Sequence, residues 1–269
     1  MTQKPQLAGT VATTHTIVDR NDDHSITHTE HKEIQRDRTR RPERIKTNKQ
    51  TNRACAQQNF FNGITRYATD KSETPLMKAA ANGHWECCKF LLDEGAKVNH
   101  HDVNYQTALM WASAQGHVET IEGLLTHDAK IDVTTKNGEN ALFFACMFGK
   151  IDAAKILLAK GCNVVEKNKE GQSAIFAAVR CGHRELVEIL IGHGASVESI
   201  TQRGQTPLAW AAMFQQYECV KLLIAKKSDL YKQDENGQNP LDHAESTLNS
   251  HIVEELREAM RENPKKEED

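Results

Sequence analysis

Apolar residues recur along this chain at an interval much longer than the period of a single helix or strand. Six segments share one order of residues: a small polar residue, then proline or alanine, then leucine or isoleucine. The segments begin at Thr74, Thr107, Asn140, Ser173, Thr206 and Asn239, always 33 residues apart. A fixed period in the range of roughly 20–50 residues indicates a solenoid or another repeat array. We therefore predict a stack of similar units.

Each unit opens with the pattern of a helix start. In four units a hydroxyl side chain can accept hydrogen bonds from the free backbone N–H groups of the first turn. These residues are Thr74, Thr107, Ser173 and Thr206. Proline, which is tolerated at the first helical position, follows at Pro75, Pro207 and Pro240. A leucine or isoleucine comes next, with an alanine three residues later, so a short helix with a closely packed side is predicted. The alanines are Ala79, Ala112, Ala145, Ala178, Ala211 and Ala244.

A second helix and a polar loop complete each unit. In four units a glycine allows the chain to reverse after the first helix. The second helix carries an adjacent apolar pair, such as Leu157 and Leu158. It ends at a glycine or, in the second unit, at Asp128, since aspartate tolerates the left-handed conformation. The polar loop that follows suits a β-turn or hairpin that projects sideways.

Together these residues resemble the ankyrin-repeat family, whose unit of 33 residues has the form TPLxxAAxxGH, then a leucine pair, a Gly-Ala step and a glycine turn. The segment TPLMKAAANGHWECCKFLLDEGAKVN, residues 74–99, matches this form almost throughout. The resemblance covers residues 70–262 and implies five full repeats plus a C-terminal capping unit. The implied fold is an all-α solenoid of stacked helix-turn-helix units with β-turn fingers.

The chain departs from the family pattern at several turns and in its last unit. Ser72 and Tyr105 replace the turn glycine in the first two fingers, and repeat five lacks the usual Gly-His and Gly-Ala pairs. In the last unit Arg257 and Glu258 replace apolar residues of the second helix. Such polar residues suit a terminal cap, because no neighbouring repeat covers its outer side.

The regions outside the repeats differ from them in composition. Residues 1–52 are polar and show neither helical nor strand periodicity, so we predict a disordered segment that becomes basic towards its end. Residues 53–69 contain several aromatic and aliphatic side chains and are predicted to form an N-terminal capping helix. A charged tail is expected over 263–269.

The sequence offers little support for catalysis or metal binding. None of the seven cysteines forms a CxxC pair, and their odd number fits reduced thiols in the cytoplasm or nucleus. No common catalytic or phosphate-binding motif occurs, so neither an enzyme nor a cofactor is expected. The histidines at the starts of second helices, His84, His117 and His183, are assigned to structure. No apolar run approaches the ~18–20 residues of a membrane span.

Charge is distributed unevenly along the chain. Residues 1–69 hold 12 Lys and Arg against 7 Asp and Glu, a net charge of +5, whereas the whole chain has −3. The run RDRTRRPERIK, from Arg36 to Lys46, is typical of import signals, nucleic-acid contacts and solvated linkers. Acidic residues interrupt it and no aromatic residues are interleaved for base stacking, so nucleic acid is not the expected partner. A nuclear regulator that contacts nucleic acid through this arm is the alternative.

The resemblance implies a monomeric, non-enzymatic adaptor or scaffold that holds another protein. Ankyrin arrays usually bind partners on a concave face made by finger tips and first helices. Carried over by position, the predicted finger residues are Asn104, Gln106, Lys136, Asn137, Glu139, Lys169, Glu170, Gln172, Gln202, Arg203 and Gln205. The predicted first-helix residues are Met147, Phe148, Arg180, Met213 and Phe214.

Two sets of large side chains leave two interpretations open. The methionine and phenylalanine pairs of repeats three and five either form an exposed apolar patch around Arg180 or fill gaps against the next repeat. One position of the first helix holds an aromatic residue in three repeats. These side chains either pack between repeats or form an aromatic surface that faces a partner, and packing is favoured. The residues at that position are Trp111, Phe144 and Trp210.

Overall fold

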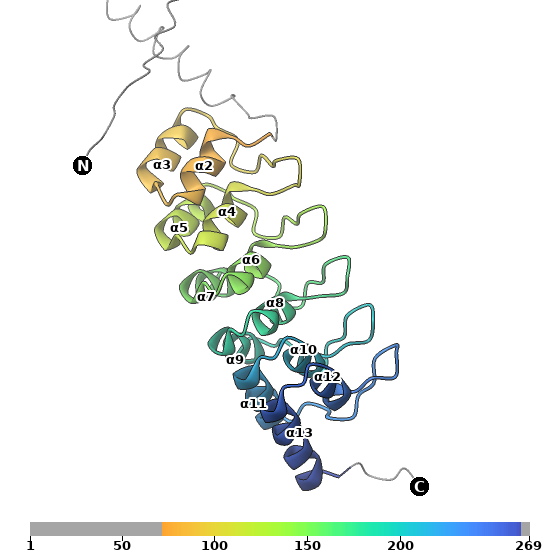
Figure 1. The fold of residues 1–269 in the computed structure, drawn as a ribbon. Coiled ribbons are helices and arrows are strands. Elements are labelled where there is room, and N and C mark those ends of the chain that lie inside the picture. Colours follow the sequence, from red (N-terminus) through yellow and green to blue (C-terminus); the bar gives the residue numbers. More distant parts are fainter. Residues whose placement is uncertain (1–71, 265–269) are drawn as a thin grey trace, which may run out of the picture. The chain divides into compact units, whose positions relative to one another are not determined.

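The computed structural model describes residues 72–264, and repeat units fill all of this region (Figure 1). Twelve helices follow one another in pairs, and the only β-structure in the described region is one isolated bridge between His101 and Thr107. The predicted all-α solenoid is confirmed. The predicted disordered segment, the capping helix, the basic run and the tail beyond residue 264 lie outside the described residues.

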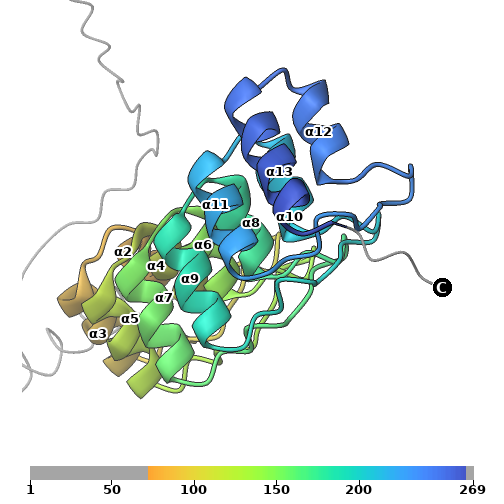
Figure 2. The ribbon, with the colours of Figure 1, turned by 90° about the horizontal axis from the view of Figure 1, so that it is seen from below.

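The helices form two rows. The first helices of the units are α2 (Pro75–Ala81), α4 (Ala108–Gln115), α6 (Ala141–Met147), α8 (Ala174–Arg180), α10 (Pro207–Met213) and α12 (Pro240–Ser246). The second helices are α3 (Trp85–Asp93), α5 (Val118–Thr126), α7 (Ile151–Ala159), α9 (Arg184–Gly192), α11 (Tyr217–Ala225) and α13 (Ser250–Glu262). Each helix packs on its counterpart in the next unit, and Figure 2 shows the two rows side by side. The long loops between units project from one side as fingers.

The apolar interior lies between the two rows of helices. Leu142, Ala145 and Leu157 are fully buried there, and so are most of their counterparts in the other repeats. The alanines of the first helices are small enough to let neighbouring helices approach closely. Because one repeat cannot bury its apolar side alone, its stability depends on the interfaces with its neighbours.

Capping of the first helices follows the predicted pattern with one exception. The hydroxyls of Thr74, Thr107 and Thr206 each accept a hydrogen bond from the amide of the third helical residue. The same prediction is wrong for Ser173, whose hydroxyl makes no capping bond. The amide of Phe176 donates instead to the Ser173 carbonyl oxygen at 3.0 Å, so that amide is already satisfied.

Residues other than glycine adopt the left-handed conformation where the family's glycine is missing. The φ angles of Tyr105, Asp128 and Gln215 are 66°, 63° and 58°. This conformation costs an L-residue roughly 1–2 kcal/mol. The stacked neighbours therefore hold the turn geometry even where the local sequence disfavours it.

From the second unit to the fifth, the side chain at the start of the second helix packs on the preceding repeat. The Nε2 atom of His117 lies 3.1 Å from the carbonyl oxygen of Ala81. Its ring lies so close to Gly83 that a Cβ atom at that glycine would come within 2.5 Å. Gln216 replaces the histidine in repeat five, and its Nε2 donates to the Arg180 carbonyl oxygen, also at 3.1 Å. The structural assignment of His117 is confirmed, and repeat five keeps the same interface.

Candidate protein-binding face

One polar side chain at the base of each finger holds the turn in shape. In the first finger Asp102 Oδ1 accepts hydrogen bonds from the amides of Asn104 and Gln106, both at 2.8 Å. A polar side chain that accepts from its own turn stands in for a backbone partner. The equivalent residues of the later fingers are Thr135, Asn168, Thr201 and Asp234.

The base of the fifth finger is a buried carboxylate. Burial alone would raise the pKa of Asp234, but the amides of Gln238 and Asn236 donate to it and His243 Nε2 lies 3.1 Å away. These contacts together hold the pKa of Asp234 below its ordinary value. The carboxylate is therefore ionised at neutral pH and acts as an acceptor for the finger.

A ladder of backbone hydrogen bonds joins each finger to the next. Lys136 N donates to the Asn104 carbonyl oxygen at 3.0 Å, and Lys169 N to that of Asn137 at 2.7 Å. Two further bonds of this kind, at 2.9 and 3.0 Å, join the remaining fingers. The fingers approach so closely that a Cβ atom at Gly171, whose φ is +77°, would lie 2.7 Å from the Gln202 amide nitrogen. The tips thus form a fixed row.

Most of the predicted finger residues are accessible to solvent, some fully and others only in part. The exposed tips are Asn104, Lys136, Asn137, Lys169, Glu170, Gln202 and Arg203. At the inner edge of each finger the side chain is more covered, and Gln106, Glu139 and Gln172 are half-buried. Together the finger tips and the first helices α2, α4, α6, α8 and α10 make up what we call the finger face.

Gln205 was predicted to bind a partner, and this prediction is wrong. Its side chain is only 8% exposed. The Oε1 atom accepts a hydrogen bond from Trp210 Nε1 at 3.0 Å. Gln205 therefore satisfies the buried indole rather than facing solvent.

The aromatic position of the first helices is used mainly for packing. Trp210 is 7% exposed, and its ring packs edge-on against Phe176 and Phe214, with centroids 5.2 Å apart in both pairs. Phe144 is also buried, so the packing interpretation is confirmed for these two positions. Trp111 is only half-buried, and its buried Nε1 atom has no hydrogen-bond partner within residues 72–264.

The methionine and phenylalanine pairs divide between the two interpretations. Phe148 is 51% exposed, as an anchor for a partner would be. Phe214 is half-buried against Trp210, and the Arg180 guanidinium lies over its ring, 5.4 Å from the centroid. Met147 and Met213 are half-buried as well. Of the residues predicted to form the patch, Phe148 is the exposed apolar one, and the Phe214 ring lies beneath the Arg180 guanidinium.

The first full finger carries an aromatic stack that sequence reasoning missed. The rings of His101 and Tyr105 lie nearly parallel, 4.1 Å apart, and Lys136 Nζ lies 5.7 Å from the Tyr105 ring. Tyr105 is 46% exposed. The signal was present, because tyrosine stands where later fingers have glycine, but it was interpreted only as a departure from the pattern.

The buried cysteines of the described region are poorly suited to nucleophilic chemistry. Burial raises the pKa of the Cys88, Cys162 and Cys219 thiols to about 11, so these thiols are protonated at neutral pH and poor nucleophiles. Within residues 72–264 no group of three or more histidine, cysteine, aspartate or glutamate side chains is placed to hold a metal ion. None of the described helices combines the length and apolar character of a membrane span.

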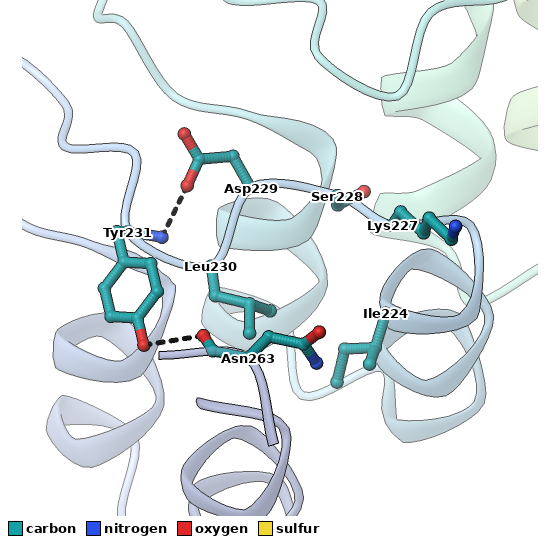
Figure 3. A pocket seen from close by; sticks show the side chains of 7 residues that line it. All are labelled: Ile224, Lys227, Ser228, Asp229, Leu230, Tyr231 and Asn263. Atoms are coloured by element: carbon teal, nitrogen blue, oxygen red, sulfur yellow. Dashed lines mark hydrogen bonds between the residues drawn. The ribbon is translucent and has the colours of Figure 1, made fainter. Parts of the chain in front are cut away.

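A hollow of about 330 Å³ lies where the last turn of α13 meets the loop after α11 (Figure 3). The Tyr231 hydroxyl donates to the Asn263 carbonyl oxygen at 3.0 Å, and Asp229 Oδ1 accepts from the Tyr231 amide at 2.8 Å. Ser228 stands where other repeats have alanine or cysteine, and its Oγ is buried without a partner in the described region. The hollow marks the junction with the cap and contains none of the predicted binding residues.

A family model of ankyrin repeats matches the sequence in three copies, over residues 49–135, 124–201 and 197–267. These matches cover most of the chain, which therefore belongs to the ankyrin-repeat family. The ankyrin repeat is a general protein-interaction fold and is typically non-catalytic.

The fold is also similar to solved structures. One is the crystal structure of the human ASB11 ankyrin repeat domain, with 29% sequence identity and a TM-score of 0.65. The similarity covers 70% of this chain and 84% of that one. In all, 604 chains of solved structures match, so the fold alone selects no partner. No curated protein matches the sequence.

Proposed function

We propose that this protein is a non-enzymatic adaptor or scaffold that binds another protein on its finger face, the face that is concave in ankyrin arrays. The observation that carries the proposal is the exposed Phe148 ring, directly after α6, which neighbours the helix of Arg180. Aromatic and arginine side chains are the residues that protein interfaces concentrate and that dominate their binding energy.

The backbone beneath this surface supports a rigid mode of binding. A polar side chain at the base of each finger holds its turn, and the ladder of backbone hydrogen bonds from Asn104 to Glu235 joins the tips. Association costs less when the binding surface is ordered before the partner arrives. The proposed mechanism is therefore docking of a partner onto a preformed surface.

The test is capture of partner proteins by the full chain from a lysate of its own cells. Phe148→Ala should reduce capture of the principal partner by roughly 5–30-fold, the loss that follows from removing an anchor worth about 1–2 kcal/mol. The melting temperature should hardly change, because half of this side chain is in solvent.

Phe90→Ala is the matched control, because Phe90 is an exposed phenylalanine on a second helix, outside the finger face. Equal loss of capture in both variants would contradict a specific role for the finger face. Unchanged capture by Phe148→Ala, together with a large fall in melting temperature, would show that Phe148 is a packing residue.

The alternative function, contact with nucleic acid through the run from Arg36 to Lys46, concerns residues outside the described region and stays a prediction. Binding of nucleic acid that weakens steeply with added salt and disappears when this run is deleted would support it.

A further inference from the structure

We infer that the finger face recognises an acidic segment with apolar side chains, in which a carboxylate pairs with Arg180 and an apolar side chain packs on Phe148. This inference rests on the proposed function and specifies the chemistry of the partner. Three observations carry it: the distribution of charge between the two rows of helices, the placement of Arg180, and the spacing of the exposed side chains.

In the first five units the two rows of helices differ in charge. The first helices α2, α4, α6, α8 and α10 contain no aspartate or glutamate, and Lys78 and Arg180 are their only charged residues. Each of the second helices α3, α5, α7, α9 and α11 has an acidic residue in its first turn. The outer row is thus acidic, and the finger face carries cations.

The finger tips carry further cations. Lys136, Lys169 and Arg203 are exposed there. Three carboxylates lie at the same tips: Glu139 accepts a hydrogen bond from the Thr135 hydroxyl, Glu170 accepts one from the Gln172 side-chain amide, and Glu235 is exposed. None of the three cations forms an ion pair within residues 72–264, so all three are available to a negatively charged partner.

Arg180 is placed to receive a carboxylate. Its guanidinium lies over the Phe214 ring at 5.4 Å, and no carboxylate within residues 72–264 forms an ion pair with it. Stacking on a ring restricts the guanidinium and leaves its N–H groups available for a two-point bond to a carboxylate. The half-buried ring below also reduces solvent screening of that bond.

The register of the stack sets the spacing of a matching segment. Phe148 is the C-cap residue of α6 and Phe214 that of α10, and both helices pack on α8, which carries Arg180. Neighbouring helix axes lie about 8–10 Å apart, so Arg180 is about one such step from Phe148. An extended chain covers that step with about three residues. We therefore expect an apolar residue about three positions from the acidic one.

The exposed Phe148 favours a protein segment over nucleic acid. Its ring offers a surface for an apolar side chain, which a phosphate backbone does not supply. Nucleic acid is therefore treated as an outcome of the test, not as the expected ligand.

The experiment uses the immobilised full chain to select binders from a display library of random peptides of about twelve residues. The selected peptides are then labelled, and their affinity for the full chain is measured. The selected peptides should be enriched in aspartate or glutamate with an apolar residue about three positions away. Arg180→Glu should weaken a selected peptide about tenfold or more, as loss of a charge-assisted hydrogen bond does. Replacing the peptide's acidic residue by lysine should restore binding to Arg180→Glu.

Lys160→Glu is the matched control, because Lys160 is exposed at the end of a second helix. This substitution should leave peptide binding unchanged. Peptides that depend on Phe148 but are not acidic, or that bind Arg180→Glu equally well, would overturn this inference and leave the proposed function standing. If no peptide is enriched and Phe148→Ala also captures its partner normally, both fall. Stronger binding of a labelled single-stranded oligonucleotide than of any peptide, lost in Arg180→Glu, would replace the protein partner with nucleic acid.

Discussion

Phe148 and Phe214 occupy the same position in repeats three and five, yet one is exposed and the other half-buried. Phe214 packs on Trp210 of its own repeat, where repeat three has Phe144, and the repeat before each phenylalanine differs as well. Arg180 precedes Phe214 in the stack and lies over its ring, whereas the equivalent residue before Phe148 is Ala114, which is too short to cover a ring. Exposure on the finger face therefore depends on contacts within the unit and with its neighbour, and position within the repeat is not sufficient to predict it.

The largest effect is expected in the interior, where the repeats are most alike. Leu157 is fully buried between the rows, so Leu157→Ala should lower the free energy of unfolding by about 2–5 kcal/mol. The exposed Lys160→Ala should change it by less than about 0.5 kcal/mol. Urea denaturation monitored by circular dichroism measures both, and similar losses would mean that the helical register is wrong.

A second comparison concerns the tryptophans of repeats two and five. Gln205→Ala should cost about 1–3 kcal/mol, because it leaves the buried Nε1 of Trp210 without an acceptor. Gln106 stands at the same position beside Trp111 but makes no such bond. Gln106→Ala should therefore change stability by less than about 0.5 kcal/mol. Equal costs in denaturation experiments would show that the two repeats do not differ in this contact.

The contrast between the two phenylalanines can be measured directly. Phe214→Ala should cost about 1–2 kcal/mol, since it removes an edge-on contact with Trp210 and the support of Arg180. Phe148→Ala should cost less than about 0.5 kcal/mol. A larger stability loss for Phe148→Ala than for Phe214→Ala, measured by thermal unfolding, would reverse the comparison on which the proposed anchor rests.

The smallest effect should be a gain. Tyr105 has a φ of 66° where Gly138 and its later counterparts stand, so Tyr105→Gly removes backbone strain and should stabilise the protein by up to about 1 kcal/mol. Part of the gain is offset because glycine increases the entropy of the unfolded chain. The reciprocal Gly138→Ala should be destabilising, since its Cβ would lie 3.0 Å from the Asn168 Cα atom. A lower melting temperature for Tyr105→Gly would mean that the stack with His101 outweighs the strain.

The sequence predicted the interior better than the surface, for a physical reason. Burial of Leu142 or Ala145 depends on a period that all units share, and so it can be derived from spacing alone. Gln205 is buried with its hydrogen bond to Trp210, a bond that Gln106 does not make with Trp111 at the same spacing. The same position is half-buried in Gln106, Glu139 and Gln172. Contacts that occur in only one repeat cannot be derived from what the repeats have in common.

The failure at Ser173 and the missed stack at Tyr105 have a similar origin. A serine at a helix start is a good cap in general, but here the Phe176 amide donates its hydrogen bond to the Ser173 carbonyl oxygen. Tyrosine in a glycine position was counted as a defect, although the fixed row of fingers can hold a side chain in that conformation. Both cases required knowledge of local backbone geometry that residue types do not provide.

The ladder that joins the fingers has a consequence for how such a chain can change in length. Each bond links equivalent positions, so inserting or deleting 33 residues would keep every bond of the row in register. A single inserted residue within a finger would shift its tip and break the bonds to both neighbours, and a side chain in place of Gly171 would already collide with the next finger. Evolutionary changes in the length of the chain should therefore add or remove whole repeats. Such changes lengthen or shorten the finger face while preserving its geometry.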